Sequence, residues 1–491
     1  MSKGFIRYEI RNHVEYASVY RASRVDGKKK NETTLWLGKV IDKERGIYKN
    51  RKRGVFQYTL ENGEIEYLPL IPEKLILDFG DSFFLNEMLS KCGFIGLTSD
   101  VFCELSDTIH SLIFYKILHG GASCHAQNWW EGSYSRMLFS KASLPSQRVS
   151  EVLRLLGDEA LQRSFFSKYL TYISSKIQGS VLIDSTGLPN DIRFPLSAIN
   201  NHNGVISNES RLILVLERES KLPIYFRYVA GNIVDVTTLQ TTIAEMKEFG
   251  IAVNHAIVDA GYYSEKNIRG LRKEKVSFLL RMSTNRKLYK ELIAEHGHSL
   301  ENAQHLVKYR ERFVFMKRVE IDLFGVVGYA YVSLDIERKH DELKKYFNRA
   351  YDDKDISVDD MNSTMNSKGF FVLVSSEELD ITDVLPLYYT RQAIEQVFDF
   401  SKNNTDLLPL RIHGIDNFRG HLFISFLSSV AYILVNNMLN ESDFCVSGAN
   451  CVLRNLKCKV YDEKILVQEP NKKMNDIAKV VGLIFPPSIT L

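Results

Sequence analysis

A charged stripe within an amphipathic stretch is the part of the sequence best suited to chemistry. Its members recur at spacings of three, four, three and four residues, at Tyr388, Arg391, Glu395, Phe398 and Lys402. At about 100° per residue, these side chains fall within an arc of about 80° on one face of a helix. Apolar residues follow on the adjacent face and would pack against a sheet. The pattern predicts a helix over 388–402 that turns charges toward a neighbouring element.

Two aspartates upstream supply the rest of a candidate site. Asp184 ends the apolar segment "SVLID" and Asp259 ends "HAIVD", and both segments are typical of strands in an α/β sheet. Ligands gather at the carboxyl ends of strands in open α/β sheets, so we expect both side chains to face Glu395. Three carboxylates without a cation would repel one another, whereas hard oxygen ligands suit Mg²⁺ or Mn²⁺. The sequence therefore predicts a metal site at Asp184, Asp259 and Glu395.

Such a site predicts phosphoryl transfer. Two divalent ions about 3.5–4 Å apart can activate an attacking oxygen and stabilise a leaving oxygen, so no Ser, His or Cys nucleophile is needed. Arg391 would hold a phosphate as a bidentate fork and Lys402 would hold one as a point charge. Tyr388 would pack on a sugar or phosphate. The stripe is thus interpreted as facing metal ions and a phosphodiester backbone.

Each of these residues also has a plain structural interpretation. Glu395 would serve equally as an ordinary partner of Arg391, four residues before it on the same helix. The sequences "DSTG" and "DAGY" suit turns in which an Asp side chain bonds to nearby backbone. The convergence of three carboxylates favours the metal site. A Walker-type phosphate loop, GxSxG, HExxH and a GxGxxG after a strand are all missing from the sequence.

The composition is that of a globular protein of more than one domain, with 491 residues, 45% hydrophobic and 25% charged. The longest apolar run, His421–Val435, contains three serines and is shorter than the roughly 20 residues of a spanning helix, which favours a buried core helix and no membrane association. The first residues lack the apolar segment of a secretory signal, so we expect the protein to stay in the compartment where it is made, the cytoplasm. Six cysteines without zinc-site spacing are expected to be free thiols.

Positive charge is concentrated at the N-terminus. Residues 1–60 hold 15 Lys and Arg against 6 Asp and Glu, a net +9, so a chain of net charge +3 carries −6 elsewhere. This asymmetry indicates an end that binds a polyanion. Two clusters fall in expected loops near Trp36, Tyr48 and Tyr58, and they consist of Lys28, Lys29, Lys30, Arg51, Lys52 and Arg53. They are interpreted as DNA-phosphate contacts with aromatic support, or alternatively as solvated hairpin loops.

Changes in hydrophobic periodicity predict an α/β protein of six segments. In order along the chain, these are a small basic β-rich DNA-binding module over 1–71, a helical domain over 72–177, the first part of a catalytic core over 178–283, a β-rich insertion over 284–367, the second part of the core over 368–440, and a C-terminal tail over 441–491. The sequence gives no role for the tail.

The signature residues now resemble a known family. The spacing Tyr388-x2-Arg391-x3-Glu395-x6-Lys402 is similar to the Y-(2)-R-(3)-E-(6)-K signature of the DDE transposases of bacterial insertion sequences, in the IS-four type. The stretches "LIDSTG", "YVAGNIVDVTTL", "IVDAGYYSEKNI" and "RGHLFISFL" resemble flanking blocks of that family in the expected order. The resemblance covers residues 178–435.

The resemblance implies an RNase H-like catalytic core, with Asp184, Asp259 and Glu395 as catalytic residues that bind two Mg²⁺ or Mn²⁺ ions. The first two lie 75 residues apart and the last two 136 apart, and the longer gap would hold the insertion. In relatives the insertion supplies an aromatic residue, often Trp, that receives a flipped base. This insertion has no Trp, which leaves Phe324 or Tyr329 as candidates.

The implied activity is cleavage of transposon ends by metal-activated water, followed by attack of the freed 3′-hydroxyl on target DNA. The implied partners are double-stranded DNA, as terminal inverted repeats and as target, and a second copy of the chain when two ends are paired. Two alternatives remain open. One is an inactive or domesticated protein that binds DNA ends, and the other is a metal-dependent nuclease without strand transfer.

Overall fold

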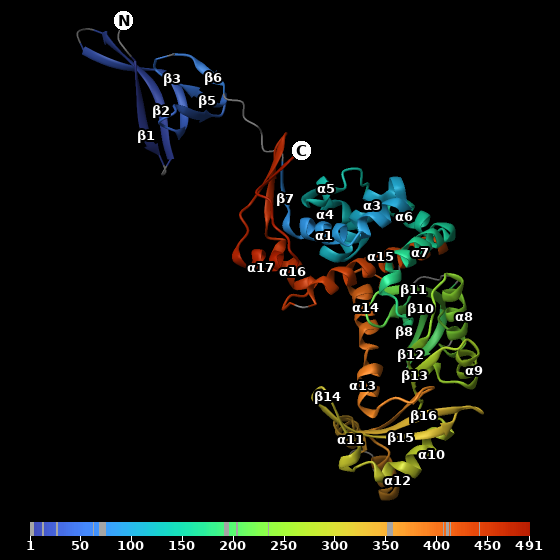
Figure 1. Cartoon of the computed structure of the whole chain (residues 1–491). Coiled ribbons are helices and arrows are strands. Elements are labelled where there is room, and N and C mark those ends of the chain that lie inside the picture. The colour runs from blue at the N-terminus through green and yellow to red at the C-terminus, as the bar shows by residue number, and fades with distance from the viewer. Residues whose placement is uncertain are drawn as a thin grey trace. The chain divides into compact units, whose positions relative to one another are not determined.

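A computed structural model describes most of the chain (Figure 1). The described residues are 4–11, 14–25, 28–61, 63–67, 75–190, 196–202, 205–233, 235–350, 357–405, 407–408, 412, 414–440 and 442–491. The chain divides into two compact units. The first comprises Met1–Ile76, Lys459–Leu466 and Ser488–Leu491, and the second comprises Leu77–Cys458 and Val467–Pro487. Both helices and strands are abundant, so the prediction of a mixed α/β protein is confirmed.

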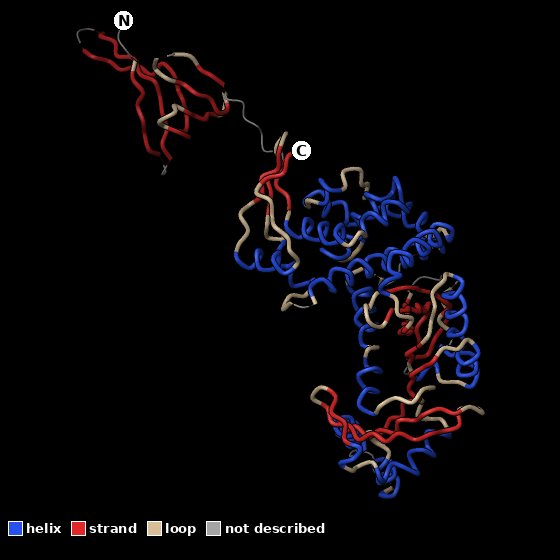
Figure 2. Tube along the Cα trace, viewed as in Figure 1, coloured by secondary structure: helices blue, strands red, loops and turns tan. Residues whose placement is uncertain are grey.

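The N-terminal module is an antiparallel sheet in which each strand pairs with the next in sequence. Its strands, which Figure 2 shows in red, are β1 (Phe5–Arg11), β2 (Val14–Val25), β3 (Lys28–Asp42), β4 (Ile47–Asn50), β5 (Gly54–Tyr58) and β6 (Ile65–Tyr67). Alternate side chains point to one face and form a small core around Leu37, Tyr48 and Phe56. Gly38 has a φ of +92°, and a Cβ there would lie 2.3 Å from the Lys49 carbonyl oxygen. Only glycine therefore permits this approach of β3 to β4.

Helices follow in the second unit. They are α1 (Gly80–Lys91), α2 (Phe94–Phe102), α3 (Ser106–Leu118), α4 (Ala126–Gly132), α5 (Ser135–Leu138), α6 (Ser146–Leu156) and α7 (Glu159–Ile173). Gly157 separates α6 from α7, and the Asp158 side chain caps α7 by accepting the Leu161 N–H at 2.9 Å. The helical pattern is thus set by local capping as well as by apolar spacing.

The long helix α15 (Ile415–Leu439) is the core of this helical region. Its length and composition would suffice to cross a membrane, but 78% of its most apolar window is buried inside the protein. It packs on α3 and α6, and a Cβ at Gly420 would lie 1.7 Å from the Leu153 carbonyl oxygen, so the backbones of α15 and α6 touch. The prediction of a buried core helix is confirmed.

A ten-stranded sheet carries the candidate site, in the order β11-β10-β8-β12-β13-β17-β16-β15-β14 with β9 beside β10. The strands are β8 (Ser180–Pro189), β9 (Ala198–His202), β10 (Val205–Glu217), β11 (Pro223–Ala230), β12 (His255–Val258), β13 (Ser277–Arg281), β14 (Leu306–Tyr309), β15 (Arg312–Asp322), β16 (Val327–Asp335) and β17 (Phe370–Ser375). Figure 1 shows α8 (Asp235–Glu248) and α9 (Glu265–Lys273) on one side of the central strands, and α13 (Ile381–Tyr389) and α14 (Gln392–Asn403) on the other.

The segment expected as a β-rich insertion is mixed. Besides β14–β16 it contains α10 (Lys287–His296), α11 (Ile336–Ala350) and α12 (Val358–Asn366). Its strands are not a separate sheet, because β16 pairs antiparallel with β17, which in turn pairs with β13. Alternating hydrophobicity can predict strands but not their partners, so this continuity was not visible in the sequence.

The C-terminal tail adds α16 (Val446–Leu453), α17 (Lys472–Val480) and three short strands. The strands β18 (Lys457–Val460), β19 (Lys464–Val467) and β20 (Ser488–Thr490) form a four-stranded sheet of order β20-β19-β18-β7, with β7 at Leu75–Asp78. The tail therefore has a structural role that its sequence pattern did not indicate.

Candidate active site

Strand register places the two candidate aspartates side by side. β8 and β12 pair in parallel from Ser180↔His255 to Ile183↔Val258. Asp184 and Asp259 are the next residues on these neighbouring strands, which lie about 4.8 Å apart in a sheet. The expectation that Asp184 ends its strand is wrong, because β8 continues to Pro189 through antiparallel pairing with β10. Its position next to Asp259 is unaffected.

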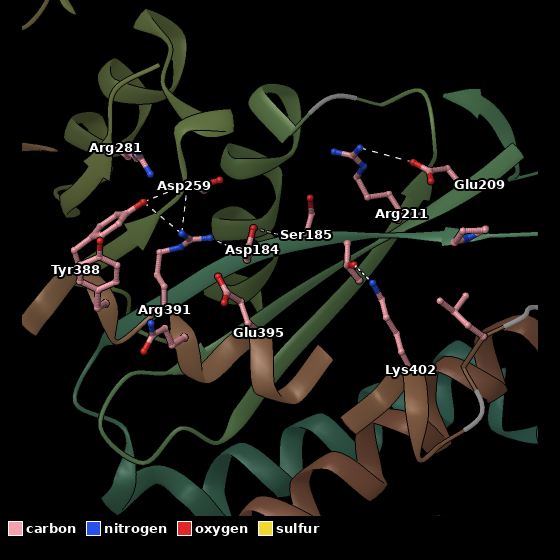
Figure 3. Close-up of a pocket in the computed structure, with 16 residues that line it drawn as sticks. Asp184, Ser185, Glu209, Arg211, Asp259, Arg281, Tyr388, Arg391, Glu395 and Lys402 are labelled. Atoms are coloured by element: carbon pink, nitrogen blue, oxygen red, sulfur yellow. Dashed lines mark hydrogen bonds and ion pairs between the residues drawn. The ribbon is translucent and has the colours of Figure 1, made fainter. Parts of the chain in front are cut away.

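The guanidinium of Arg391 joins the two aspartates (Figure 3). Its Nη2 donates to Asp184 Oδ2 at 2.6 Å, and its Nη1 donates to Asp259 Oδ1 at 3.3 Å. The Tyr388 hydroxyl donates to the same Asp259 oxygen at 3.2 Å. Two signature residues that the sequence assigned to DNA therefore contact the aspartates in this structure.

The signature stripe spans two helices and not one. α13 ends at Tyr389 and α14 begins at Gln392. The Thr390 hydroxyl donates to the Leu387 carbonyl oxygen at 2.7 Å, and a side-chain bond of this kind competes with regular helix hydrogen bonding. Arg391 keeps helix-like dihedrals of φ −55° and ψ −25°, so the stripe stays on one side across the break.

Glu395 comes from the first turn of α14, and Figure 3 shows its side chain on the same side as Asp184 and Arg391. It is exposed, and within the described ranges no ion pair joins it to Arg391. The alternative in which Glu395 is merely a helical partner of Arg391 is thus not what the structure shows. Among the described residues, however, no group of three His, Cys, Asp or Glu side chains is close enough to hold a metal ion.

Burial and charge shape the site together. Burial raises the pKa of Asp184, and the nearby Asp259 adds to that rise, although Arg391 and the Ser185 N–H oppose it. Burial acts to lower the pKa of Arg391, but Asp184, Tyr388 and Asp259 together outweigh it and the pKa of Arg391 is raised. Arg391 therefore stays charged, and it carries the positive charge that lets two carboxylates lie next to each other.

Lys402 occupies another part of the same site. Its Nζ donates to the Thr186 hydroxyl at 2.6 Å, and Thr186 is two residues beyond Asp184 and hence on the same face of β8. Burial lowers the pKa of Lys402, against the attraction of Asp399 and Glu209. The last turn of α14 thus delivers a cation to the strand that carries Asp184.

These side chains surround one pocket. It has a volume of about 840 Å³ and is lined by all of the residues that the sequence placed here, namely Asp184, Asp259, Tyr388, Arg391, Glu395 and Lys402. Three carboxylates and two predicted cations thus come from strands and helices far apart in the chain. The structure brings the candidate residues into one place, with Arg391 already bound to two of the acids.

Sequence analysis missed other residues of this pocket, among them Arg211, Glu209 and Arg281. Arg281 is the last residue of β13, the strand beside β12, and Figure 3 shows it near Asp259. Its guanidinium lies 5.6 Å from the centre of the Phe371 ring. The sequence signal that could have identified Arg281 is the same as for Asp259, namely a charged residue at the end of a buried strand.

The basic clusters of the N-terminal module have different surroundings. Lys28–Lys30 begin strand β3 and are not in a loop as expected, since they pair with residues 23–25 of β2; their side chains lie outside the described part. Arg51–Arg53 do form the expected turn, where the N–H groups of Lys52 and Arg53 donate to Asn50 Oδ1 at 3.1 and 2.8 Å.

The aromatic residues near these clusters divide into two groups. Tyr48 and Tyr58 are 1% and 7% exposed and belong to the core, so the expectation that they support phosphate contacts is wrong. Both point to the buried side of their strands, a consequence of strand alternation. Trp36 is 44% exposed, and the Arg11 guanidinium lies 5.7 Å from the centre of its ring. Trp36 is therefore the aromatic residue of the three that remains accessible.

A family model matches the part of the chain that carries this site. The family model described as "Transposase DDE domain" matches residues 181–431, which include the three carboxylates and the four signature residues. Among curated proteins, no sequence matches significantly. A similar solved structure is the cryo-EM structure of a piggyBac transposase synaptic complex with hairpin DNA, with 11% identity, a TM-score of 0.40, and coverage of 78% of this chain and 80% of that chain. Since the family model spans just over half of the chain, this protein belongs to the transposase DDE domain family.

Proposed function

We propose that this transposase cleaves the ends of an insertion sequence and joins them to target DNA by metal-dependent phosphoryl transfer. The observation that carries the proposal is the pocket in which Asp184, Asp259 and Glu395 meet the cations Arg391 and Lys402. Two adjacent strand aspartates and a glutamate from a covering helix also support an RNase H-like core of the IS-four type. Chemistry at a phosphodiester needs both groups, acids for metal ions and cations for phosphates.

The donor set fits Mg²⁺ or Mn²⁺. All three candidate ligands are carboxylates, and hard cations of this kind prefer oxygen ligands. Asp259 and Glu395 are accessible from the pocket, since the Asp259 side chain is 46% exposed and Glu395 is exposed. We propose that Asp184, Asp259 and Glu395 hold two ions. When bound, the ions would supply an activated attacking oxygen and stabilise the leaving oxygen.

The chain's own residues would orient this reaction. The Ser185 N–H donates to Asp184 Oδ1 at 2.8 Å and the Tyr388 hydroxyl donates to Asp259, so both carboxylates are held in place before DNA arrives. Arg281 and Lys402 lie at different parts of the pocket and would hold successive phosphates of one strand. The strand would then run along β8 with its scissile phosphate next to the carboxylates.

Contacts outside the pocket would extend the DNA interface. The turn Arg51–Arg53 and the strand segment Lys28–Lys30 are proposed to bind the DNA backbone of the terminal repeats, as part of a dimer on paired ends. Phe324 is the proposed acceptor of a flipped base. It lies in the turn between β15 and β16, with a φ of +57°, and its ring centre is 6.3 Å from that of Tyr263. Tyr263 lies four residues after Asp259, which puts Phe324 close to the catalytic strand.

Incubation of the purified chain with Mg²⁺ and duplex DNA carrying the repeats that flank its gene tests this function. We expect cut ends and joined products on a sequencing gel. Cutting without joining would instead identify a nuclease, and a mobility shift without cutting would identify an inactive end-binding protein.

Matched variants assign the chemistry to the pocket. Glu395→Gln should abolish cutting and retain DNA binding. Asp383→Asn is the control, because Asp383 is an exposed acid on the preceding helix α13 and does not line the pocket. Normal cutting by Glu395→Gln would remove that residue from the proposed mechanism.

A further inference from the structure

The position of Arg391 suggests a role beyond phosphate binding, and the inference rests on the proposed function. The side chain of Arg391 is 10% exposed, whereas those of Asp184 and Asp259 are 17% and 46% exposed. The guanidinium is therefore the most buried of the three charged groups. It donates to both aspartates, and all three side chains line the pocket.

The oxygens that Arg391 uses are those a divalent ion would need. Asp184 has one oxygen on the Ser185 N–H and the other on Arg391 Nη2, so both of its oxygens are engaged. Asp259 Oδ1 accepts from both Arg391 and Tyr388. A dication bound to Asp184 Oδ2 would lie beside the guanidinium, and the two positive charges would repel each other.

The β8–β12 register also indicates that Arg391 stabilises the pair of aspartates. Because the two strands are in parallel pairing up to Ile183 and Val258, the carboxylates that follow cannot move far apart. A cation between them offsets their repulsion. Arg391 is thus placed both to hold the aspartates together and to exclude a second cation from the same oxygens.

We propose that Arg391 is an internal cation that competes with the divalent metal for Asp184 and Asp259, and that a DNA phosphate in the pocket relieves this competition. The Nε of Arg391 is buried and has no hydrogen-bond partner among the described residues. A phosphate oxygen would satisfy that group and offer the guanidinium an alternative anion. Metal and DNA would then bind cooperatively, each favouring the arrangement in which Arg391 has left Asp184.

Mn²⁺ binding to the full chain without DNA tests the competition, measured by isothermal titration calorimetry. We expect Arg391→Gln to bind Mn²⁺ about tenfold more tightly than wild type, within the range of typical coupling between sites. Arg281→Gln is the matched control. It removes a positive charge from the same pocket, but within the described residues Arg281 forms no ion pair with either aspartate. Its Mn²⁺ affinity should rise no more than about threefold, as expected for a screened charge.

The melting temperature provides a second test of the competition. Without metal, Arg391→Gln should melt at a lower temperature than wild type, because the two aspartates lose their shared cation. Saturating Mn²⁺ should raise its melting temperature by more than it raises that of wild type. If Arg391→Gln does not fold, Arg391→Lys replaces it: the variant keeps the charge but lacks the fork that spans both acids, so its Mn²⁺ affinity should also rise.

The outcomes separate this proposal from the proposed function. A wild-type Mn²⁺ affinity in both Arg391 variants, or a gain no larger than that of Arg281→Gln, overturns the competition. Asp184→Asn should lose Mn²⁺ binding; if it binds as wild type does, the pocket is not the metal site and the proposed function fails as well.

Fluorescence anisotropy of a short labelled duplex tests the coupling to DNA, with Ca²⁺ or with EDTA. Ca²⁺ should raise the DNA affinity of wild type more than that of Arg391→Gln. Equal gains in the two proteins would overturn the coupling.

Discussion

Two partly buried Asp–Arg pairs of this protein look alike in isolation and differ in their surroundings. Asp335 has a side chain 1% exposed, and it contacts Arg312 with Oδ2 and accepts the Arg338 N–H with Oδ1 at 3.0 Å. Asp184 likewise uses one oxygen for a backbone N–H and the other for Arg391. Asp335, the last residue of β16, is thereby bound to the start of β15 through Arg312 and to the first turn of α11 through Arg338. The pair at Asp184 faces a second carboxylate and a pocket, and this difference separates a candidate active site from a structural contact.

Replacing the two aspartates should therefore break different properties, and the largest effect is expected at Asp184. Asp184→Asn should lower the rate of DNA cleavage at least about a thousandfold, because losing several kcal/mol of metal stabilisation costs tenfold for each 1.36 kcal/mol or so. Its melting temperature should fall less than that of Asp335→Ala, because the loss of the Arg391 contact is offset by the loss of repulsion between Asp184 and Asp259. Single-turnover cleavage and thermal melting measure the two effects. If Asp184→Asn melted at a temperature as low as that of an Asp335 variant, Asp184 would be a structural contact like Asp335.

Asp335→Ala gives the next largest effect, on stability. It leaves Arg312 without its buried partner and removes the acceptor at the start of α11, so the free energy of unfolding should fall on the order of 3 kcal/mol. Urea denaturation followed by circular dichroism measures it. The control is Asp341→Ala, an exposed acid on the same helix. Equal stability of the two variants would show that the Asp335 pair contributes nothing.

The pH dependence of stability sharpens the comparison further. Burial raises the pKa of Asp184 above its ordinary value of 3.8. An acid with a raised folded-state pKa contributes stability that is fully present below its ordinary pKa and is lost as pH rises through the raised one. With EDTA present, the stability of wild type relative to Asp184→Asn should therefore fall as pH rises from below 3.8 toward neutrality. Urea titrations at several pH values test this, and a difference that grows with pH would contradict the direction.

The smallest expected effect concerns the exposed cations of the N-terminal module, which contrast with the buried Arg391. Replacing Arg51, Lys52 and Arg53 together with Gln should weaken DNA binding and reduce the salt slope by about 0.9 for each lost phosphate contact. The control removes three exposed cations of α17, Lys472, Lys473 and Lys479. An unchanged salt slope in the variant of Arg51, Lys52 and Arg53 would show that this turn is a solvated loop that does not contact DNA phosphates.

That the candidate site residues share one pocket was predictable from the sequence, because their spacing follows regular geometry. The stripe places Tyr388, Glu395 and Lys402 on one side, and apolar runs before Asp184 and Asp259 mark adjacent strands. The residues that Arg391 contacts could not be predicted from the sequence. A guanidinium suits a carboxylate and a phosphate equally well, and only the strand register shows that two carboxylates lie within its range.

The fold was predictable where signals are local. Examples are the cap at Ser264, which accepts the Asn267 N–H at 3.2 Å, and the β10–β11 hairpin, because both depend on residues close together in the chain. Pairing between distant strands was not predictable, and it explains the continuous sheet through β17 and the extension of β8 past Asp184. Lys28–Lys30 were misplaced for a different reason, because a charged run in β3 has no apolar alternation to mark it as a strand.

The central claim is that Asp184, Asp259 and Glu395 jointly hold divalent metal in this pocket. Anomalous diffraction from crystals grown with Mn²⁺ tests it most directly. The account predicts anomalous peaks about 2.1 Å from oxygens of Asp184 and Asp259, as for other small hard cations, with Glu395 turned toward them. Crystals that bind Mn²⁺ only at other acidic residues, with Arg391 still joining the two aspartates, would contradict it.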